Sequence, residues 1–430
     1  MLPPFTDSLP GARELDQADS LAKFREAFLH PLHGDSRAIY FCGHSLGLQP
    51  KNVQASFAQE LKDWEELAVG GYRNAKQPWL FYQQAFAPPL SRLLGCAEQE
   101  LTVMNSLTVN LHLLLTSFFQ PSPDRYQILM EAGAFPSDQY AVQTQIAFHC
   151  RNLSRWGIQP APLQDWRIEL SPRDGEKILR EEDILESIDK HKESLALVLL
   201  GGINYYSGQL LDMKTITAAA HRAGALAGFD LAHAVGNVPL RLSEWDLDFA
   251  VWCSYKYLNG GPGAAGGAYI HERHAKDRSL VRLGGWWGSA EDTRFQMLPV
   301  FVPKADAHGW NLSTAPVFNL AALRASLELF AEAGMDQLRS KSLRLTAYLE
   351  YLLKRCSRLR FTVITPEDPD RRGAQLSLYF SDRGKEVFDH LGRQGVIADY
   401  REPGVIRLAP APMYNSFEDV YRLYSILQQL

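Results

Sequence analysis

The stretch Ala225-Leu-Ala-Gly-Phe-Asp-Leu-Ala-His233, followed by Asp248-Phe-Ala-Val-Trp-Cys-Ser-Tyr-Lys256, decides the predicted fold of this chain. Each part contains a short apolar run that is typical of a buried strand, and each run ends in polar residues. The first run ends at Asp230, and the second leads into Tyr255 and Lys256. Because the carboxyl ends of neighbouring parallel strands lie at one edge of a sheet, we expect this acid and this lysine to lie close together.

Short β-rich runs alternate with helical patterns on either side of this stretch. Such alternation predicts βαβ units, and therefore an α/β fold in which helices flank a mostly parallel sheet. Strands are expected over residues 126–130, 195–200, 225–229 and 249–253, a helix over 213–222, and amphipathic helices over 55–67 and 81–94.

The pattern changes near Pro316, where a smaller α+β domain is expected to begin. Its expected elements are a helical segment over 318–356, strands over 361–364, 375–380 and 405–408, a helix over 385–393, and a final helix that Ser416 caps. We therefore predict an N-terminal segment (1–54) that packs on the small domain, a large α/β domain (55–315) and a small C-terminal domain (316–430).

The composition is that of an ordinary globular protein: 46% of the 430 residues are hydrophobic and the net charge is −5. Since there is no run of lysine and arginine, nothing predicts a nucleic acid or a membrane surface as a partner, and a small molecule is expected instead. The N-terminus lacks the pattern of a signal peptide, and no apolar run approaches the roughly 20 residues that span a bilayer. Five scattered cysteines form no Cys-x-x-Cys pair, so we expect reduced thiols, no metal site and a cytoplasmic protein.

Three matches to common motifs have simpler explanations. Gly43-His-Ser-Leu-Gly47 fits the G-x-S-x-G pattern of serine hydrolases, but the 42 residues before it are too few for the strands that precede such a nucleophile. A hydrolase using Ser45 is nevertheless the alternative from a different class. Gly261-Pro-Gly-Ala-Ala-Gly266 fits G-x-G-x-x-G but leads into a strand, where a dinucleotide site needs a helix. His271-Glu-Arg-His274 spaces its histidines three apart, not the four of a zinc motif, which favours an ordinary helical turn.

Lys256 and Asp230 allow two interpretations. A buried lysine and acid can form a structural ion pair. Alternatively, the lysine can form an imine with an aldehyde cofactor while the acid keeps a pyridine nitrogen protonated, and these are two needs of pyridoxal phosphate. A phosphate site and a stacking aromatic ring are then also required. The helix start within Asn105-Ser-Leu-Thr-Val-Asn110 can provide the first, and Phe135 the second.

The full set of motifs resembles the fold-type I pyridoxal-phosphate enzymes, and specifically the kynureninase family. The likeness runs from about Tyr40 to the C-terminus and rests on residues 105–112, Phe135-Pro-Ser-Asp138, 228–237, 252–259 and 409–416. The resemblance implies that residues 55–315 bind pyridoxal phosphate and that two identical chains form a dimer with shared active sites. It also implies that Lys256 forms the internal aldimine, that Asp230 contacts the pyridinium nitrogen, and that Phe135 stacks on the ring.

The same resemblance assigns further residues to the site. Leu107, Thr108 and Tyr255 hold the phosphate; Pro136, Ser137, Asp138 and His233 complete the cofactor contacts; Trp286 and Thr314 reach the site from the partner subunit; Tyr72 and Thr314 face the substrate ring; and Arg407 binds the substrate α-carboxylate. A bidentate guanidinium suits that last task. Gly201 stands where relatives often have a hydroxyl residue, so one cofactor contact is expected to be lost.

The reaction implied by the resemblance is hydrolytic cleavage of the Cβ–Cγ bond of L-kynurenine to anthranilate and L-alanine, with Lys256, Asp230 and Tyr255 as catalytic residues. 3-Hydroxy-L-kynurenine, which would give 3-hydroxyanthranilate, is the other candidate substrate, and Thr314 favours the unhydroxylated one. The role would be tryptophan catabolism or the supply of a precursor to NAD. A cysteine desulfurase and a class V aminotransferase share the fold and are alternatives, although Cys356 lies in a helical run that is unsuited to reach the cofactor.

Overall fold

The two strands that decide the fold are neighbours in the structure, a computed structural model that describes residues 3–430. β10 (Leu226–Asp230) pairs in parallel with β11 (Phe249–Trp252), and Asp230 lies opposite Val251. The polar residues that follow both strands therefore lie at one edge of the sheet, as the sequence predicts.

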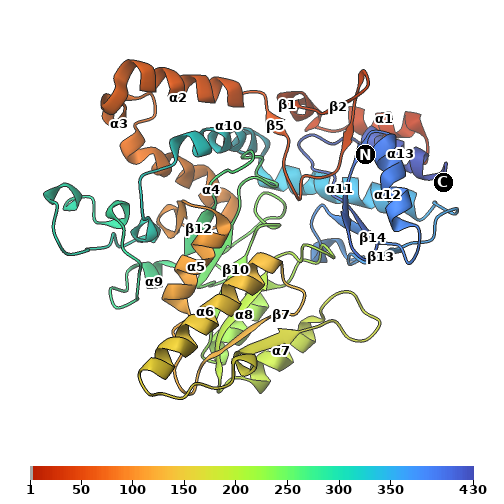
Figure 1. The fold of residues 1–430 in the computed structure, drawn as a ribbon. Helices are drawn as coiled ribbons and strands as arrows, with labels where there is room; N and C mark the ends of the chain where they lie inside the picture. Colours follow the sequence, from red (N-terminus) through yellow and green to blue (C-terminus); the bar gives the residue numbers. More distant parts are fainter. Residues whose placement is uncertain (1–2) are drawn as a thin grey trace.

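These strands belong to a larger sheet with β6 (Leu101–Val103), β7 (Gln127–Glu131), β8 (Arg167–Leu170), β9 (Leu195–Gly201) and β12 (Gly267–Ile270). The order of the seven strands is β6-β12-β11-β10-β9-β7-β8. Three of them, β12, β10 and β7, are labelled in Figure 1. The five strands from β11 to β8 are parallel, and β12 runs antiparallel to both of its neighbours. The predicted α/β class with a mostly parallel sheet is confirmed.

Helices cover both faces of this sheet. Leu197 and Leu199 of β9 pack in an apolar cluster with α5 (Leu107–Phe118) and α6 (Pro136–Arg155). Val198 and Leu200 pack in a second cluster, with α7 (Glu181–Lys190) and α8 (Met213–Arg222). Because both faces are buried, β9 is a continuous apolar run in which polar and apolar residues do not alternate.

The C-terminal part forms a second, antiparallel sheet. It contains β13 (Thr362–Val363), β14 (Leu376–Tyr379), β17 (Val405–Leu408) and β16 (Asp399–Arg401), in that order. Beside it lie α11 (Met335–Leu353), α12 (Gly384–Arg393) and α13 (Phe417–Leu427). The Asp419 N–H donates to Ser416 Oγ (3.1 Å), which confirms the predicted cap of the last helix.

Two predicted helices are wrong in extent. The segment 318–356 contains two helices, α10 (Val317–Ala333) and α11, because Gly334 between them adopts a φ of +76° that a helix cannot contain. The segment 81–94 begins as a 3₁₀ helix (Trp79–Phe86), and only α4 (Ala87–Leu94) is α-helical. Pro88 and Pro89 occupy the first turn of α4, where their missing N–H groups are tolerated.

The N-terminal segment lies on the C-terminal part. α1 (Leu9–Gln17) buries Ala12 and Leu15 in the same apolar cluster as Leu345 of α11 and Leu423 of α13. The short strands that follow are β1 (Phe28–Leu29), β2 (Leu32–His33), β3 (Ser36–Arg37), β4 (Ile39–Tyr40) and β5 (Gln49–Pro50), and β4 pairs with β15 (Val396–Ile397). The chain then continues through α2 (Val53–Leu67) and α3 (Gly71–Asn74). Among residues 3–430, no helix has both the length and the apolar character needed to cross a membrane.

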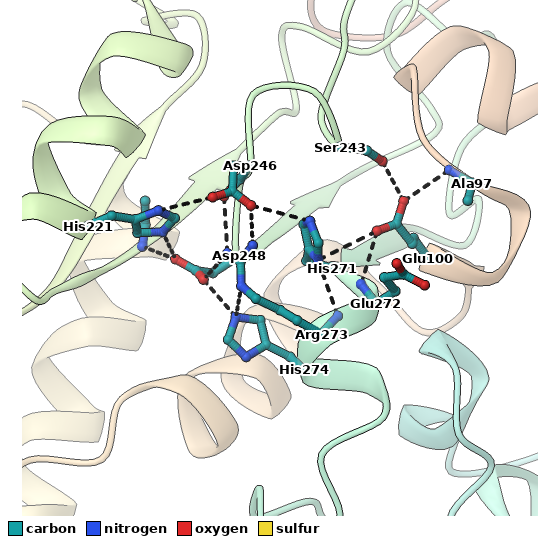
Figure 2. A network of polar contacts seen from close by, with 11 residues as sticks. Ala97, Glu100, His221, Ser243, Asp246, Asp248, His271, Glu272, Arg273 and His274 are labelled. Atoms are coloured by element: carbon teal, nitrogen blue, oxygen red, sulfur yellow. Dashed lines mark hydrogen bonds and ion pairs between the residues drawn. The ribbon is translucent and has the colours of Figure 1, made fainter.

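The amino-terminal end of β11 carries a network of polar contacts (Figure 2). Asp248, which is 1% exposed, accepts hydrogen bonds from the Ala227 N–H (2.7 Å) and from the side chains of His221 (2.9 Å), His274 (2.7 Å) and Arg273 (2.5 Å). Arg273 and His274 belong to α9 (Glu272–Ala275), a short helical turn as the sequence predicts. The network ties α8 and α9 to the sheet at the end opposite Asp230.

Candidate active site

A cavity opens at the carboxyl edge of the large sheet. Nine residues predicted from the sequence line it: Leu107, Thr108, Phe135, Ser137, Asp138, Asp230, His233, Tyr255 and Lys256. They come from segments that follow β6, β7, β10 and β11, far apart in the chain. An isolated structural ion pair needs no such cavity, so the geometry favours a ligand site.

Lys256 reaches this cavity from the segment after β11, and its Nζ lies 5.8 Å from the centroid of the Phe135 ring. Phe135 follows β7 and is 40% exposed. Its ring packs edge-on against Tyr205 with a centroid distance of 5.3 Å. An aromatic ring at this distance from the lysine can stack on a flat cofactor joined to that lysine.

Three buried acids, Glu131, Asp138 and Asp230, line the same cavity. Burial raises the pKa of all three, and the Asp230 carboxylate raises the pKa of Asp138 further. The positive charge of Lys256 opposes the shift of Asp230, which also accepts a hydrogen bond from the Ala232 N–H (2.7 Å). Asp230, at the end of β10 beside the positive charge of Lys256, is the acid predicted to face a protonated pyridine nitrogen.

Six lining residues are not among the predicted ones: Glu131, Ala134, Ile203, Asn204, Tyr205 and Ala232. Glu131 ends β7 and accepts a hydrogen bond from Asn204 Nδ2 (2.5 Å), and Asn204 follows the end of β9. The rule that ligands bind beyond the carboxyl ends of strands could have found both. Gly201 also lines the cavity, at the end of β9.

The start of α5 provides an anion site at this cavity. The Ser106 side chain makes no capping hydrogen bond within residues 3–430, so the first N–H groups of α5, at Leu107 and Thr108, are available to a ligand. Gly266 packs against this helix start, where a Cβ would lie 3.0 Å from the Leu107 nitrogen. The backbone N–H groups and the Thr108 hydroxyl together suit a phosphate.

Tyr255 and His233 are both neutral at pH 7. Burial raises the pKa of the Tyr255 hydroxyl, which therefore keeps its proton and can donate it. Burial, together with the nearby charges of Lys256 and Arg407, lowers the pKa of His233 well below its usual value.

Arg407 lies behind the cavity and does not line it. The side chain is 1% exposed, and its Nη1 donates to the Tyr205 carbonyl oxygen (2.7 Å). Its Nε and Nη2 contact Oδ1 of Asp399 at 2.8 and 2.7 Å. Because Tyr205 lines the cavity, the guanidinium is one residue removed from it.

Besides Arg407, four predicted residues lie outside the cavity of their own chain: Pro136, Trp286, Thr314 and Tyr72. Trp286 is 49% exposed and lines a separate hollow with Leu298 and Phe301. Tyr72 is 39% exposed and packs edge-on against Trp79 at 5.8 Å. A single chain does not bring these side chains to the cavity.

The G-x-S-x-G match is a packing motif. Ser45 lies in an exposed loop between β4 and β5, and a hydrolase nucleophile would lie on a strand-to-helix turn. A Cβ at Gly43 would collide with the Tyr414 hydroxyl, and one at Gly47 would lie 2.5 Å from the Lys256 carbonyl oxygen. The serine-hydrolase alternative is therefore wrong. Gly261–Gly266 leads into β12, as predicted.

A lysine, a buried acid, a free helix start and an exposed aromatic ring fit the parts of pyridoxal phosphate. The cystine C–S lyase C-DES with cysteine persulfide has the same fold, with a TM-score of 0.75 and 17% identity over 92% of this chain and 99% of that one. A C-DES mutant with glycine covalently linked to its pyridoxal-phosphate cofactor has a TM-score of 0.74, 17% identity, and coverage of 92% and 98%. An apo cysteine desulfurase from Thermococcus onnurineus has a TM-score of 0.72, 17% identity, and coverage of 91% and 94%. These structures show that the chain has the fold of the fold-type I pyridoxal-phosphate-dependent enzymes, and the residues of the cavity fit that cofactor.

More similar relatives narrow this class. The kynureninase of Koribacter versatilis is 50% identical over 412 residues, which cover 96% of this chain and 95% of the relative. The kynureninase of Nematostella vectensis is 44% identical over 436 aligned residues, with coverage of 96% and 92%. A profile described as the kynureninase C-terminal domain matches residues 338–427. The chain belongs to the kynureninase family.

Proposed function

We propose that this chain hydrolyses the Cβ–Cγ bond of L-kynurenine to anthranilate and L-alanine with the help of pyridoxal phosphate. One observation carries the proposal: a chain 50% identical to a kynureninase over nearly its full length also brings nine predicted site residues to one cavity. The water consumed in the reaction supplies the new carboxylate oxygen and the hydrogen atoms that complete the two products.

Four residues of the cavity have defined tasks in this reaction. The bound cofactor withdraws electrons from the substrate, which allows bonds at Cα and Cβ to break. Asp230 holds a proton on the pyridine nitrogen, and the N–H groups of Leu107 and Thr108 bind the phosphate. Lys256 binds the cofactor and, as a free amine, takes the proton from Cα.

Tyr255 is the candidate proton donor for the bond that breaks. Its hydroxyl would assist the oxygen of the γ-ketone and then protonate Cβ. The raised pKa keeps the hydroxyl protonated across the physiological range, so the proton is present when the substrate binds.

The thiols of this chain disfavour a cysteine desulfurase, which needs a nucleophilic thiolate. Burial raises the pKa of Cys356 to about 11 and that of Cys42 to about 12. Cys253, the cysteine nearest Lys256 in sequence, also has a pKa raised by burial. A class V aminotransferase differs in its products, so the reaction itself tests that alternative.

We further propose a homodimer with shared sites. Trp286 and Thr314 are exposed and lie away from the cavity of their own chain, as expected of side chains that serve the partner. The segment 281–301 around Trp286 exposes the large apolar residues Val281, Leu283, Phe295, Met297, Leu298, Val300 and Phe301. Such a patch is typical of an interface. Thr314 and Tyr72 would set the preference between L-kynurenine and 3-hydroxy-L-kynurenine.

The cellular role that we propose is tryptophan catabolism or supply of a precursor to NAD, in the cytoplasm. The first test is anthranilate fluorescence after L-kynurenine is added to protein saturated with pyridoxal phosphate, with L-alanine measured on the same sample. Equal amounts of both products are expected. A transamination product without anthranilate would support the aminotransferase, and no turnover of either kynurenine would contradict the proposed function.

A further inference from the structure

The loop Gly43–Gly47 connects the neighbourhoods of Arg407, the predicted ligand of the substrate carboxylate, and Lys256, the predicted ligand of the cofactor. At one end, Cys42 forms a β-bridge with Ala409, which lies two residues beyond Arg407. At the other end, the Gly47 N–H donates to the carbonyl oxygen of Tyr255 (2.8 Å), next to Lys256. The loop therefore runs from the neighbourhood of the guanidinium to that of the amine.

His44 is the polar side chain that this loop buries. It is 1% exposed, and within residues 3–430 neither of its ring nitrogens has a hydrogen-bond partner of good geometry, although the Phe41 backbone lies near enough to favour the protonated ring. An unpartnered buried polar atom destabilises a protein, so such an atom is usually explained by a ligand or by function. The histidine therefore has an N–H to offer at this place in the fold.

The surroundings of His44 carry a surplus of positive charge. Arg407 and Arg401 share one carboxylate, Asp399, with contacts of 2.7 and 3.0 Å. Burial and the charges of Arg407, Lys256 and Arg401 lower the pKa of His44, so the ring is neutral and adds no charge of its own. The ring of His233, which lines the cavity, lies 6.2 Å from the His44 ring. A small anion that displaced the contact between Arg407 and the Tyr205 carbonyl oxygen would meet the guanidinium on one side and the neutral His44 ring on another.

We propose that His44 is a second binding residue for the α-carboxylate of the substrate, donating its ring N–H to one carboxylate oxygen while Arg407 binds the other. The inference rests on the proposed function, which makes an α-amino acid the ligand. It also uses the predicted role of Arg407, which is to bind the α-carboxylate of that ligand. It explains why a histidine with two free nitrogens is buried in a loop that packing alone would fill with an apolar residue.

The experiment compares two small ligands that differ only at the carboxylate. L-Alanine and L-alaninol are titrated into the cofactor-loaded protein, and their dissociation constants are read from the visible absorbance of the cofactor. The variants are His44→Phe, which removes the donor, and His44→Asn, which keeps an amide donor of shorter reach. His149→Phe is the matched control, because this half-buried histidine packs on Phe119, away from the cavity.

His44→Phe is expected to weaken L-alanine binding about tenfold to a hundredfold, while L-alaninol binding changes little. His44→Asn is expected to fall between this variant and the wild type, and His149→Phe to match the wild type. A ratio of the two dissociation constants that is the same in the wild type and both His44 variants would overturn the proposal. This ratio requires only folded, loaded protein, so a loss of stability does not imitate the effect. A wild type that binds L-alanine but leaves L-kynurenine intact would contradict the proposed function alone.

Discussion

Asp230 and Asp248 are both buried acids on the adjacent strands β10 and β11, yet their environments differ completely. Asp248, at the amino end, accepts four hydrogen bonds from an N–H, two histidines and an arginine (Figure 2), and these donors hold its pKa well below the usual range despite burial. Asp230, at the carboxyl end, accepts one hydrogen bond from Ala232, and burial raises its pKa. Two buried carboxylates thus have opposite pKa shifts.

The difference lies in the donors. A buried carboxylate with a full set of donors stabilises the fold and has no capacity left for a ligand. A buried carboxylate with few donors is costly until a ligand supplies the missing partner. The amino end of the sheet therefore contributes stability, and the carboxyl end provides the chemistry.

The largest effect that would sharpen this comparison is expected from Lys256→Ala. The variant loses the cofactor's covalent anchor and the base, so kcat should fall roughly a thousandfold or more, and the visible absorbance of the bound cofactor should disappear. Spectra and anthranilate fluorescence on the same sample check this. A variant that keeps its visible band would clear Lys256 of the assignment.

A smaller effect is expected from Arg407→Lys. A lysine keeps the charge but loses the bidentate geometry, so KM for L-kynurenine should rise about tenfold to a hundredfold with kcat much less affected. Steady-state kinetics separates the two constants. An unchanged KM would remove Arg407 from the carboxylate site.

The amino end should respond to pH through its histidines. The pKa of His221 is raised, chiefly by the hydrogen bond to Asp248, so its stabilisation is complete below the unfolded value of about 6.5 and is lost as the pH rises through the folded pKa. Burial lowers the pKa of His271, so this residue makes the folded state less stable as the pH falls. We therefore expect His221→Asn to reduce the loss of thermal stability between pH 6 and pH 8, by roughly 1–3 °C in the midpoint. Melting curves across this range are the measurement. If the variant and the wild type lose stability in parallel, His221 is not the source of this pH dependence.

The smallest effect is expected from Gly201→Ser. A Cβ at this position would lie 3.5 Å from Glu131 Oε1 and from the Ile203 carbonyl oxygen, which is ordinary contact, so the hydroxyl fits at the cavity wall. The added hydroxyl should restore a cofactor contact and lower the dissociation constant of pyridoxal phosphate by about twofold to tenfold. Dialysis followed by fluorescence titration measures it, and weaker binding would show that the cavity has no place for the hydroxyl.

The sequence predicted the site well where the chain itself marks it. Asp230 ends one apolar run that is typical of a buried parallel strand, and Lys256 follows another. Their closeness at one edge of the sheet therefore follows from the topology. Glu131 and Asn204 also follow strands but belong to no motif, and their hydrogen bond joins segments more than seventy residues apart. Gly334 is one glycine in a helical pattern, and its positive φ became evident only with the tertiary packing.

The amino end shows the same limit. His274 was predicted to lie in an ordinary turn, and it does, but its partner Asp248 lies directly before β11, on another element. Nothing in the local sequence indicates that this acid collects four donors. Contacts between charged residues that are far apart in the sequence could therefore be identified only from the structure.

The comparison of the two acids is tested most directly by Asp230→Asn and Asp248→Asn, with kcat/KM on L-kynurenine and the melting temperature measured on the same preparations. We predict that Asp230→Asn loses at least a hundredfold in kcat/KM with its melting temperature within a few degrees of the wild type. Asp248→Asn is predicted to melt roughly 5–10 °C lower while its folded fraction keeps kcat/KM within about twofold. An Asp230→Asn enzyme of full activity, or an Asp248→Asn protein of unchanged stability, would contradict the division between the two ends of the sheet.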